Sequence, residues 1–213
     1  SGIIQIHDKH VLPNYIEFDE KRYFSNGNSK TFFQLNDLNV GLSICEDIWD
    51  EGFIDLQKEN NLDLLINLSA SPFTISKKEE RGNVFAKISE KLNIPLIYVN
   101  QTGGQDELVF DGTSSVINKQ GDVTVELKSF ATDSIQFNYE KINKSSITEK
   151  KSNRLKDLYD SLVLATKDYV EKNNFKGVLI GSSGGIDSAL TATIATDALG
   201  SEKVRTIMMP FKY

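Results

Sequence analysis

Apolar and polar positions along most of the chain follow patterns that predict strands and helices in turn. Continuous apolar runs bounded by turn residues indicate buried strands, whereas apolar residues three or four apart indicate helices with one buried face. Buried strands are predicted at residues 38–44, 62–68 and 95–100, and helices at residues 52–60 and 76–92. This strand–helix–strand order, followed by antiparallel strands, predicts a layered α/β domain with a mixed sheet.

Shorter segments surround these elements, and several are marked by glycine, which permits tight turns and interrupts regular structure. They are a strand at residues 1–6, a loop over a site at 7–24, a short strand beginning at Phe32, a break at Gly103 and Gly104, and a hairpin of residues 113–119 and 123–128.

A polar stretch divides the chain into two parts. After it, residues 155–169 and 189–199 have helical spacing, and residues 177–180 and 204–208 are short apolar strands. Because one βαβ unit is too small to stand as a domain and the first strand begins abruptly, we expect both domains to continue outside this chain. The predicted organisation is a first domain at residues 1–130, a linker at 131–150 with the boundary near Ile147, and the beginning of a second domain at 151–213.

Composition narrows the function classes. The 213 residues carry a net charge of −6, which argues against a nucleic-acid partner or a membrane surface. No apolar run approaches the length that spans a bilayer. One cysteine cannot form an internal disulfide, which favours the cytoplasm, and two histidines with one cysteine argue against a zinc cage.

The only cysteine, Cys45, follows the apolar run at residues 38–44 directly. A strand tip exposes such a side chain to a pocket, as many nucleophiles are exposed, although a lone cysteine is more commonly an inert core residue. Glu46 and Asp47 come next, and we interpret them as caps of the following helix rather than as a general base.

Residues 181–188, Gly-Ser-Ser-Gly-Gly-Ile-Asp-Ser, lie between a predicted strand and a predicted helix. Adjacent glycines let successive amides face one point, and the helix N-terminus favours an anion there, so the loop is typical of a phosphate site. Asp187 is suited to hold a phosphate-bound Mg²⁺ or to cap the helix. The loop is neither a Walker A loop nor a dinucleotide turn, and the plain alternative is an ordinary helix cap.

This loop resembles the Ser-Gly-Gly-x-Asp-Ser motif of the ATP-pyrophosphatase superfamily, and the surroundings of Lys9 and Cys45 resemble the nitrilase superfamily. Together the chain is similar to the glutamine-dependent NAD⁺ synthetases. The resemblance rests on residues 8–9, 12–15, 18–24, 45–49, 67–73, 101–114 and 208–210 as well as the loop. It implies a nitrilase-type α-β-β-α domain, followed by the start of a Rossmann-like ATP-pyrophosphatase domain.

The resemblance also implies roles for single residues. Cys45 would be the nucleophile that attacks the glutamine amide, and Lys9 would stabilise the thiolate and the oxyanion. The family's general base is a glutamate upstream of the Lys9 segment, outside this chain. Glutamine would be bound by Tyr15, Ser71, Lys77, Glu107 and Phe110. ATP would be bound by Gly181, Ser182, Ser183, Gly184, Gly185, Ile186, Asp187 and Ser188, with Asp187 on Mg²⁺.

The implied function is a cytoplasmic, homo-oligomeric ligase that releases ammonia from glutamine and uses it, with ATP and Mg²⁺, to amidate deamido-NAD⁺. Two alternatives stay open at this point. One is a stand-alone nitrilase-type amidase, and the other is a catalytically silent nucleotide-binding fragment.

Overall fold

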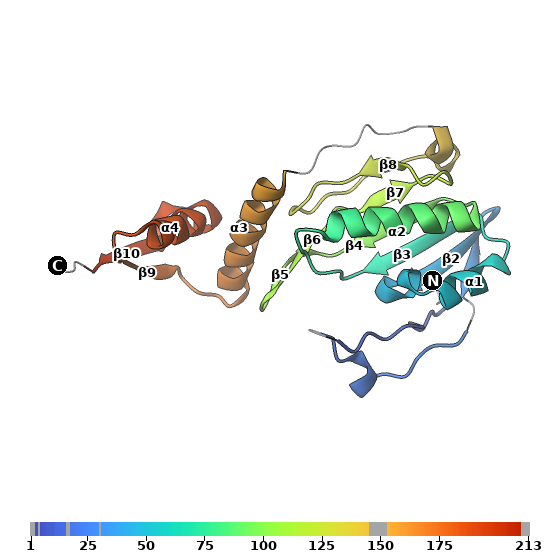
Figure 1. The fold of residues 1–213 in the computed structure, drawn as a ribbon, viewed down its shortest axis with the longest axis horizontal. Helices are drawn as coiled ribbons and strands as arrows, with labels where there is room; N and C mark the ends of the chain where they lie inside the picture. Colours follow the sequence, from blue (N-terminus) through green and yellow to red (C-terminus); the bar gives the residue numbers. More distant parts are fainter. Residues whose placement is uncertain (1–2, 4, 16–17, 30, 145–152, 210–213) are drawn as a thin grey trace.

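The computed structural model describes residues 3, 5–15, 18–29, 31–144 and 153–209. Its centre is a six-stranded mixed sheet in the order β1-β2-β3-β4-β7-β8 (Figure 1). The strands are β1 (Phe32–Leu35), β2 (Leu38–Ile44), β3 (Leu64–Ser69), β4 (Leu96–Asn100), β7 (Ser115–Ile117) and β8 (Val123–Glu126). β2, β3 and β4 are parallel and the outer strands antiparallel, which confirms the predicted mixed sheet.

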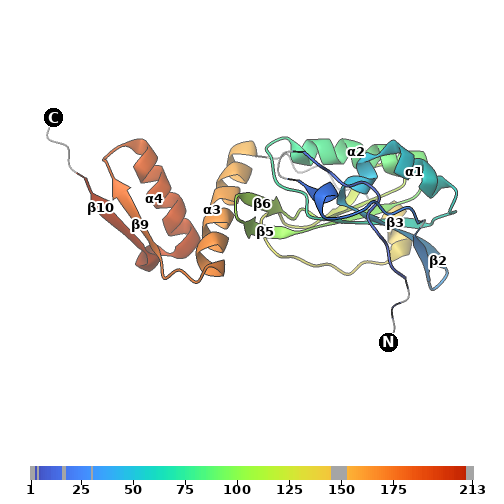
Figure 2. The same cartoon turned by 90° about the horizontal axis from the view of Figure 1, so that it is seen from below.

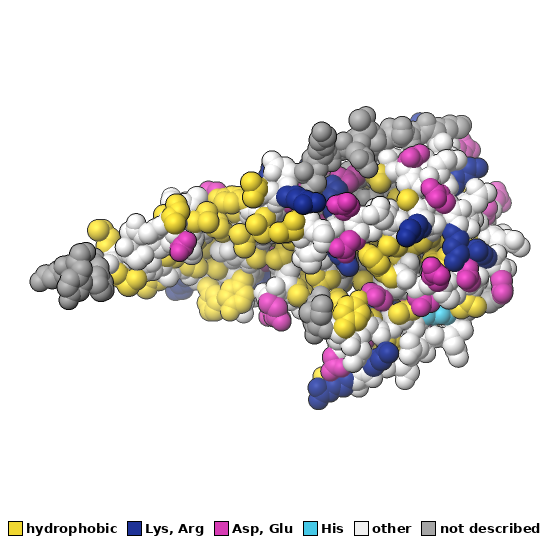
Figure 3. All heavy atoms as spheres, viewed as in Figure 1, with side chains coloured by type: hydrophobic (Ala, Val, Ile, Leu, Met, Phe, Trp, Pro, Cys, Tyr) yellow, Lys and Arg dark blue, Asp and Glu magenta, His cyan; other side chains and the backbone are white. Residues whose placement is uncertain are grey.

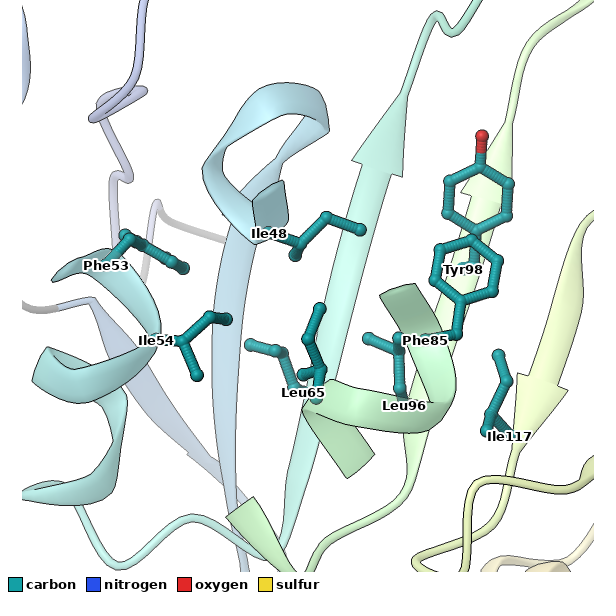
Figure 4. Close-up of a cluster of buried hydrophobic side chains, with 9 residues drawn as sticks. Ile48, Phe53, Ile54, Leu65, Phe85, Leu96, Tyr98 and Ile117 are labelled. Atoms are coloured by element: carbon teal, nitrogen blue, oxygen red, sulfur yellow. The ribbon is translucent and has the colours of Figure 1, made fainter. Parts of the chain in front are cut away.

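Two helices, α1 (Glu51–Lys58) and α2 (Lys77–Leu92), cover one face of this sheet (Figures 1 and 2). The core lies between them and the sheet, where each fully buried large apolar side chain contributes about 1.5–3 kcal/mol (Figure 4). Its buried members are Ile48, Phe53, Ile54, Leu65, Phe85, Ile88, Leu96, Tyr98 and Ile117. The core therefore holds the carboxyl end of β2, where Cys45 follows, firmly against α1 and α2.

The opposite face of the sheet is apolar and partly open, with Leu68 and Val99 exposed. Residues 131–137 lie against part of it, because they line a cavity of ≈ 490 Å³ together with residues of β4, β7 and β8. The short helix η3 (Tyr139–Lys144) is anchored by Tyr139, whose hydroxyl donates to the Asp63 carbonyl at 2.9 Å. The predicted linker thus contacts the first domain at the residues that line this cavity and at Tyr139. The boundary near Ile147 lies outside the described residues and stays a prediction.

The predicted break at Gly103 and Gly104 is wrong, because both glycines lie in β5 (Thr102–Gln105), which forms a hairpin with β6 (Leu108–Asp111). This hairpin packs on α3 (Arg154–Lys172). The Asp168 carboxylate accepts from the Gly104 amide at 2.8 Å, and a Cβ at Gly104 would lie 3.1 Å from the Ala165 backbone. The glycines serve close contact with the helix rather than a turn.

The C-terminal part forms the predicted βαβ unit. Strands β9 (Val178–Ser182) and β10 (Val204–Met208) are parallel, and α4 (Ile186–Leu199) and η4 (Ser201–Lys203) connect them. The helix begins three residues before the predicted residue 189, directly after Gly185. Exposed apolar side chains gather over this part of the molecule (Figure 3).

The N-terminal segment departs from the prediction in one respect. Of residues 1–6, the described Ile3, Gln5 and Ile6 form no strand, because none of the described strands pairs with them. The predicted loop at residues 7–24 is confirmed over its described residues, apart from the short helix η1 (Glu20–Arg22). None of the described helices is both long and apolar enough to cross a bilayer.

Candidate active site

Cys45 lies where β2 ends and the short helix η2 (Cys45–Trp49) begins. Its φ of 45° is in the left-handed region, which non-glycine residues rarely adopt and which is concentrated at functional sites. The side chain lines a cavity of ≈ 660 Å³ together with Lys9, Glu20 and Ala70. The structure therefore confirms that the strand tip presents the thiol to a pocket. The role of Cys45 as the nucleophile stays a prediction.

Opposing influences set the pKa of the Cys45 thiol. Burial raises it most strongly, while the Lys9 ammonium, the Ala70 amide and the Ser69 hydroxyl lower it, and Glu46 raises it again. The net pKa is above the ordinary value, so the thiol is mainly protonated at neutral pH. A reaction at Cys45 therefore needs a proton acceptor, and the ammonium next to the thiol favours the thiolate once the proton has left.

Lys9 is not the solvated surface lysine that an isolated lysine would suggest. Its side chain is 15% exposed, and Nζ lies 2.7 Å from both carboxylate oxygens of Glu20. Glu20 is a functional candidate that sequence reasoning missed, although it stands inside the motif at residues 18–24. Its two contacts fix the ammonium at the cavity that Cys45 lines.

Tyr15 and Ser71 adjoin this cavity without lining it. The Tyr15 hydroxyl donates at 2.8 Å to Oε1 of Glu46, which is the residue after Cys45. Ser71 follows Ala70 and is buried, and its amide donates to Asn100 Oδ1 at 2.9 Å. Tyr15 is thus placed to contact a ligand beside the thiol, whereas Ser71 is held by Asn100 next to Ala70, which lines the cavity.

Lys77 begins α2, with Nζ 4.4 Å from the centre of the Trp49 ring and 3.7 Å from Glu80 Oε2. Lys78, its neighbour, instead pairs with Glu126 at 2.9 Å. Of the two lysines, Lys77 is the one held beside η2, which fits the predicted carboxylate contact better.

Glu107 and Phe110 belong to the β5–β6 hairpin. Glu107 is exposed in the turn, and Phe110 is buried. Neither lines the cavity with Cys45, so the described residues do not bring these two side chains to the thiol. Their assignment to glutamine binding stays a prediction.

A buried polar network contacts the backbone of Ser71, which follows the cavity residue Ala70. The Arg81 guanidinium makes a two-pronged contact with the Asp111 carboxylate, with Nη1–Oδ1 at 3.0 Å, and both side chains are 3% exposed. The side-chain nitrogen of Asn100, Nδ2, donates to Asp111 Oδ1 at 3.3 Å and to the Ser71 carbonyl at 3.3 Å. The network ties the cavity wall to α2 and to the hairpin.

The glycine- and serine-rich loop connects β9 to α4, as predicted, in a part of the molecule separate from β2 (Figure 1). Gly184 has φ +82°, and a Cβ there would meet no atom within 4 Å, so the loop is open. The Ser188 hydroxyl donates to the Gly185 carbonyl at 3.0 Å and lies 3.4 Å from Ser183 Oγ. Asp187 is exposed in the first helical turn. This conformation suits an anion, and the ATP assignment stays a prediction.

A metal site formed by protein groups alone is absent from the described residues, which contain no group of three or more His, Cys, Asp or Glu side chains able to hold one. Mg²⁺ commonly keeps several waters and takes one or two carboxylates with substrate phosphates. The exposed Asp187 carboxylate fits that donor set at the open loop.

Comparisons with known proteins divide the chain in two. Residues 1–151 match the family "Carbon-nitrogen hydrolase", and residues 158–213 match "NAD synthase". The glutamine-dependent NAD(+) synthetase of Acinetobacter baylyi is 41% identical over 218 residues, which cover 99% of this chain and 40% of that protein. The synthetase of the same name from Synechocystis is 38% identical, over 96% of this chain and 39% of that protein. The chain thus spans about 40% of the length of these curated relatives.

Solved structures agree with this division. The glutamine-dependent NAD⁺ synthetase from Acinetobacter baumannii, in complex with ADP, has a TM-score of 0.93 and 40% identity, covering 100% of this chain and 41% of that one. A carbon-nitrogen hydrolase from Helicobacter pylori has a TM-score of 0.53 and 20% identity, over 56% of this chain and 47% of that one, and shows the fold alone. These likenesses confirm the predicted fold class, a nitrilase-type domain followed by an α/β segment of the synthetase kind.

Proposed function

Because the chain belongs to the carbon-nitrogen hydrolase family and continues into a segment of the NAD synthase type, we propose that it forms part of a glutamine-dependent NAD⁺ synthetase. In this proposal, ammonia is released from glutamine at Cys45 and amidates deamido-NAD⁺ with the help of ATP. Since the chain covers about 40% of its relatives, the activity is proposed for a protein of their length that carries these residues.

The observation that carries the proposal is the placement of Cys45, Lys9 and Glu20 around one cavity at the end of β2. A thiol at a strand tip, beside an ammonium fixed by a carboxylate, is equipped for acyl transfer. No comparable arrangement of nucleophile and cation is needed for a protein that only binds a nucleotide.

The chemistry at this cavity follows from its groups. Cys45 Sγ attacks the carbonyl carbon of the glutamine side-chain amide, the C–N bond breaks, and ammonia leaves with the proton that the thiol gave up. The positive charge on Lys9 stabilises both the thiolate and the oxygen anion of the tetrahedral intermediate. Water then hydrolyses the thioester to glutamate. Glu20 uses both oxygens on Lys9, so it orients the ammonium in this scheme.

The glutamine-binding roles are supported to different degrees. Tyr15 is held close to Cys45 by its hydrogen bond to Glu46, the next residue in the sequence. Lys77 presents an ammonium that suits an α-carboxylate. Ser71 is supported by its position next to Ala70, which lines the cavity, and by its hydrogen bond to Asn100. Glu107 and Phe110 rest on the resemblance.

The ligation step is proposed for the loop at residues 181–188. Its open glycines and the N-terminus of α4 would hold the ATP phosphates, and Asp187 would hold Mg²⁺ together with phosphate oxygens. The metal would supply charge neutralisation on the pyrophosphate that leaves. The enzyme is proposed to be cytoplasmic, which the single cysteine of this chain supports. It is also proposed to be a homo-oligomer, which rests on the resemblance.

Separate assays of the two half-reactions test the proposal. In the protein of full length, Cys45→Ala should abolish NAD⁺ formation from glutamine, ATP and deamido-NAD⁺ while sparing formation from ammonium. Lys9→Met should act in the same direction, and the matched control Lys21→Met, at an exposed lysine of η1, should leave both reactions unchanged.

Two results would contradict the proposal. Loss of both reactions in a folded Cys45→Ala variant would show that the roles are not separate. Glutamine hydrolysis without pyrophosphate release, measured with ATP and deamido-NAD⁺ present, would instead indicate a stand-alone amidase.

A further inference from the structure

Asp47 lies two residues after Cys45, and its side chain has no solvent exposure. Oδ1 accepts from the backbone amides of His10 at 2.9 Å and Val11 at 2.8 Å. Oδ2 accepts from the Ile44 amide at 2.8 Å and lies 3.2 Å from His7 Nε2. One buried carboxylate therefore contacts four nitrogen atoms.

These contacts join two distant segments of sequence. The Ile44 amide ends β2 directly before Cys45, whereas His7, His10 and Val11 flank Lys9 on the other segment. The same segment is also held by Gly27, whose amide donates to the Lys9 carbonyl at 2.8 Å. Asp47 thus holds residues on both sides of Lys9 in the sequence, and Gly27 holds the Lys9 carbonyl itself.

A helix cap would not require this arrangement. The contact with Ile44 alone satisfies an amide at the start of η2, and the three others go to residues 36 to 40 positions away. Burial alone would raise the pKa of Asp47, but the bonds from His7, Ile44, Val11 and His10 outweigh it and hold the pKa below its ordinary value. The buried group is therefore a carboxylate, whose desolvation is compensated by the segment that carries Lys9.

We propose that Asp47 is a positioning residue for the reaction proposed above: its carboxylate fixes the backbone of Lys9 relative to Cys45, and so places the ammonium beside the thiol. This inference rests on the proposed function for its chemical meaning. The placement itself is measurable without glutamine.

The test uses the rate at which iodoacetamide alkylates Cys45, the only cysteine, as a function of pH in the 213-residue chain. Asp47→Asn keeps the size of the side chain and removes the charge and one acceptor. If the ammonium moves away, the apparent pKa of the thiol should rise by about one unit, because an opposite charge nearby shifts a pKa by 1–3 units. At neutral pH alkylation should slow about threefold, since a tenfold loss of thiolate is partly offset by higher intrinsic nucleophilicity.

Two further variants separate positioning from a general structural effect. Lys9→Met should raise the thiol pKa by itself, and Asp47→Asn should add almost nothing in the Lys9→Met background. The matched control Asp50→Asn, at the exposed cap of α1, should leave the profile unchanged. The other charged or titratable groups at the thiol stay intact in Asp47→Asn and in the control, namely His7, Asp8, Lys9, Glu20 and Glu46.

An equal shift from Asp47→Asn with and without Lys9 would overturn the proposal, as would an Asp47→Asn profile identical to that of Asp50→Asn. Should Asp47→Asn fail to fold, His7→Phe removes one of the four contacts and should give a smaller shift in the same direction, and the absence of that shift would overturn the proposal. A protein of full length that fails to hydrolyse glutamine would refute the proposed function, but would leave the alkylation result on Asp47 standing.

Discussion

Asp111→Asn should cost the first domain a large part of its stability. Arg81 and Asp111 are each 3% exposed, and removal of the carboxylate charge would leave the Arg81 guanidinium buried without a counter-charge. Breaking a buried pair from one side costs about 3–5 kcal/mol. Because asparagine keeps one oxygen that can accept from Arg81 or from Thr113, we expect the lower end, about 3 kcal/mol.

Urea unfolding of the chain, followed by the fluorescence of Trp49, measures this loss. The only tryptophan is suited to the purpose because it packs against the buried core of the first domain. With a denaturant slope of about 2 kcal/mol per M, the midpoint should fall by about 1.5 M. The matched control is Asp106→Asn in the exposed turn of the same hairpin, where φ is 50° and asparagine is well tolerated.

A second substitution tests the physical reason rather than the size alone. Arg81→Gln combined with Asp111→Asn removes both charges and leaves two amides that can bond to each other. The double variant should therefore be clearly more stable than the sum of the two single losses predicts. A loss for Asp111→Asn within 0.5 kcal/mol of the control (about the spread of surface substitutions), or two additive losses, would refute the reasoning.

Three smaller changes give further predictions, all measured by the urea midpoint. Gly82→Ala should stabilise the chain by about 0.5–1 kcal/mol, because this glycine lies inside α2 and its added Cβ would meet no atom within 4 Å; an unchanged or lower midpoint would contradict this. Gly103→Ala should destabilise it, since φ is +130° and the new Cβ would lie 2.8 Å from Asp168 Oδ2; a midpoint equal to the unaltered chain would contradict that. Asp47 has a lowered pKa in the folded chain, so its contribution to stability is complete above the unfolded pKa of about 3.9 and is lost as the pH falls through the lower folded value. Asp47→Asn should therefore lose less stability than the unaltered chain between pH 5 and about pH 2, and equal losses would contradict this.

Local pattern was enough to predict the parts of the site that depend on consecutive residues. Cys45 after β2 and the loop at residues 181–188 after β9 are both strand-to-helix turns, and the periodicity on each side locates such turns. The roles of Glu20 and Asp47 could not be predicted in this way, because each depends on a contact with a segment elsewhere in the sequence. Asp47 in particular looked like a simple cap, since the contact with Ile44 is the only one of its four that the local sequence implies.

The wrong prediction at Gly103 and Gly104 has the same physical cause, a contact with a segment elsewhere in the sequence. Two adjacent glycines usually indicate a break, but here α3 binds both backbone groups of Gly104. The Gly104 amide donates to Asp168 at 2.8 Å, and Lys172 donates to the Gly104 carbonyl at 2.6 Å. The other end of the same hairpin is Asp111, which belongs to the buried network that also holds Ser71, the residue after Ala70 in the lining of the Cys45 cavity.

Among the described elements, the β5–β6 hairpin thus contacts both α3, which leads into the βαβ unit, and the network behind the nucleophile. A Cβ at Gly104 would lie 3.1 Å from the Ala165 backbone, so a side chain there would tighten the contact between a hydrogen-bonded strand of the hairpin and α3. The close approach that only glycine permits is therefore a requirement of how the two domains meet, and the cavity wall depends on residues that no local pattern around Cys45 contains.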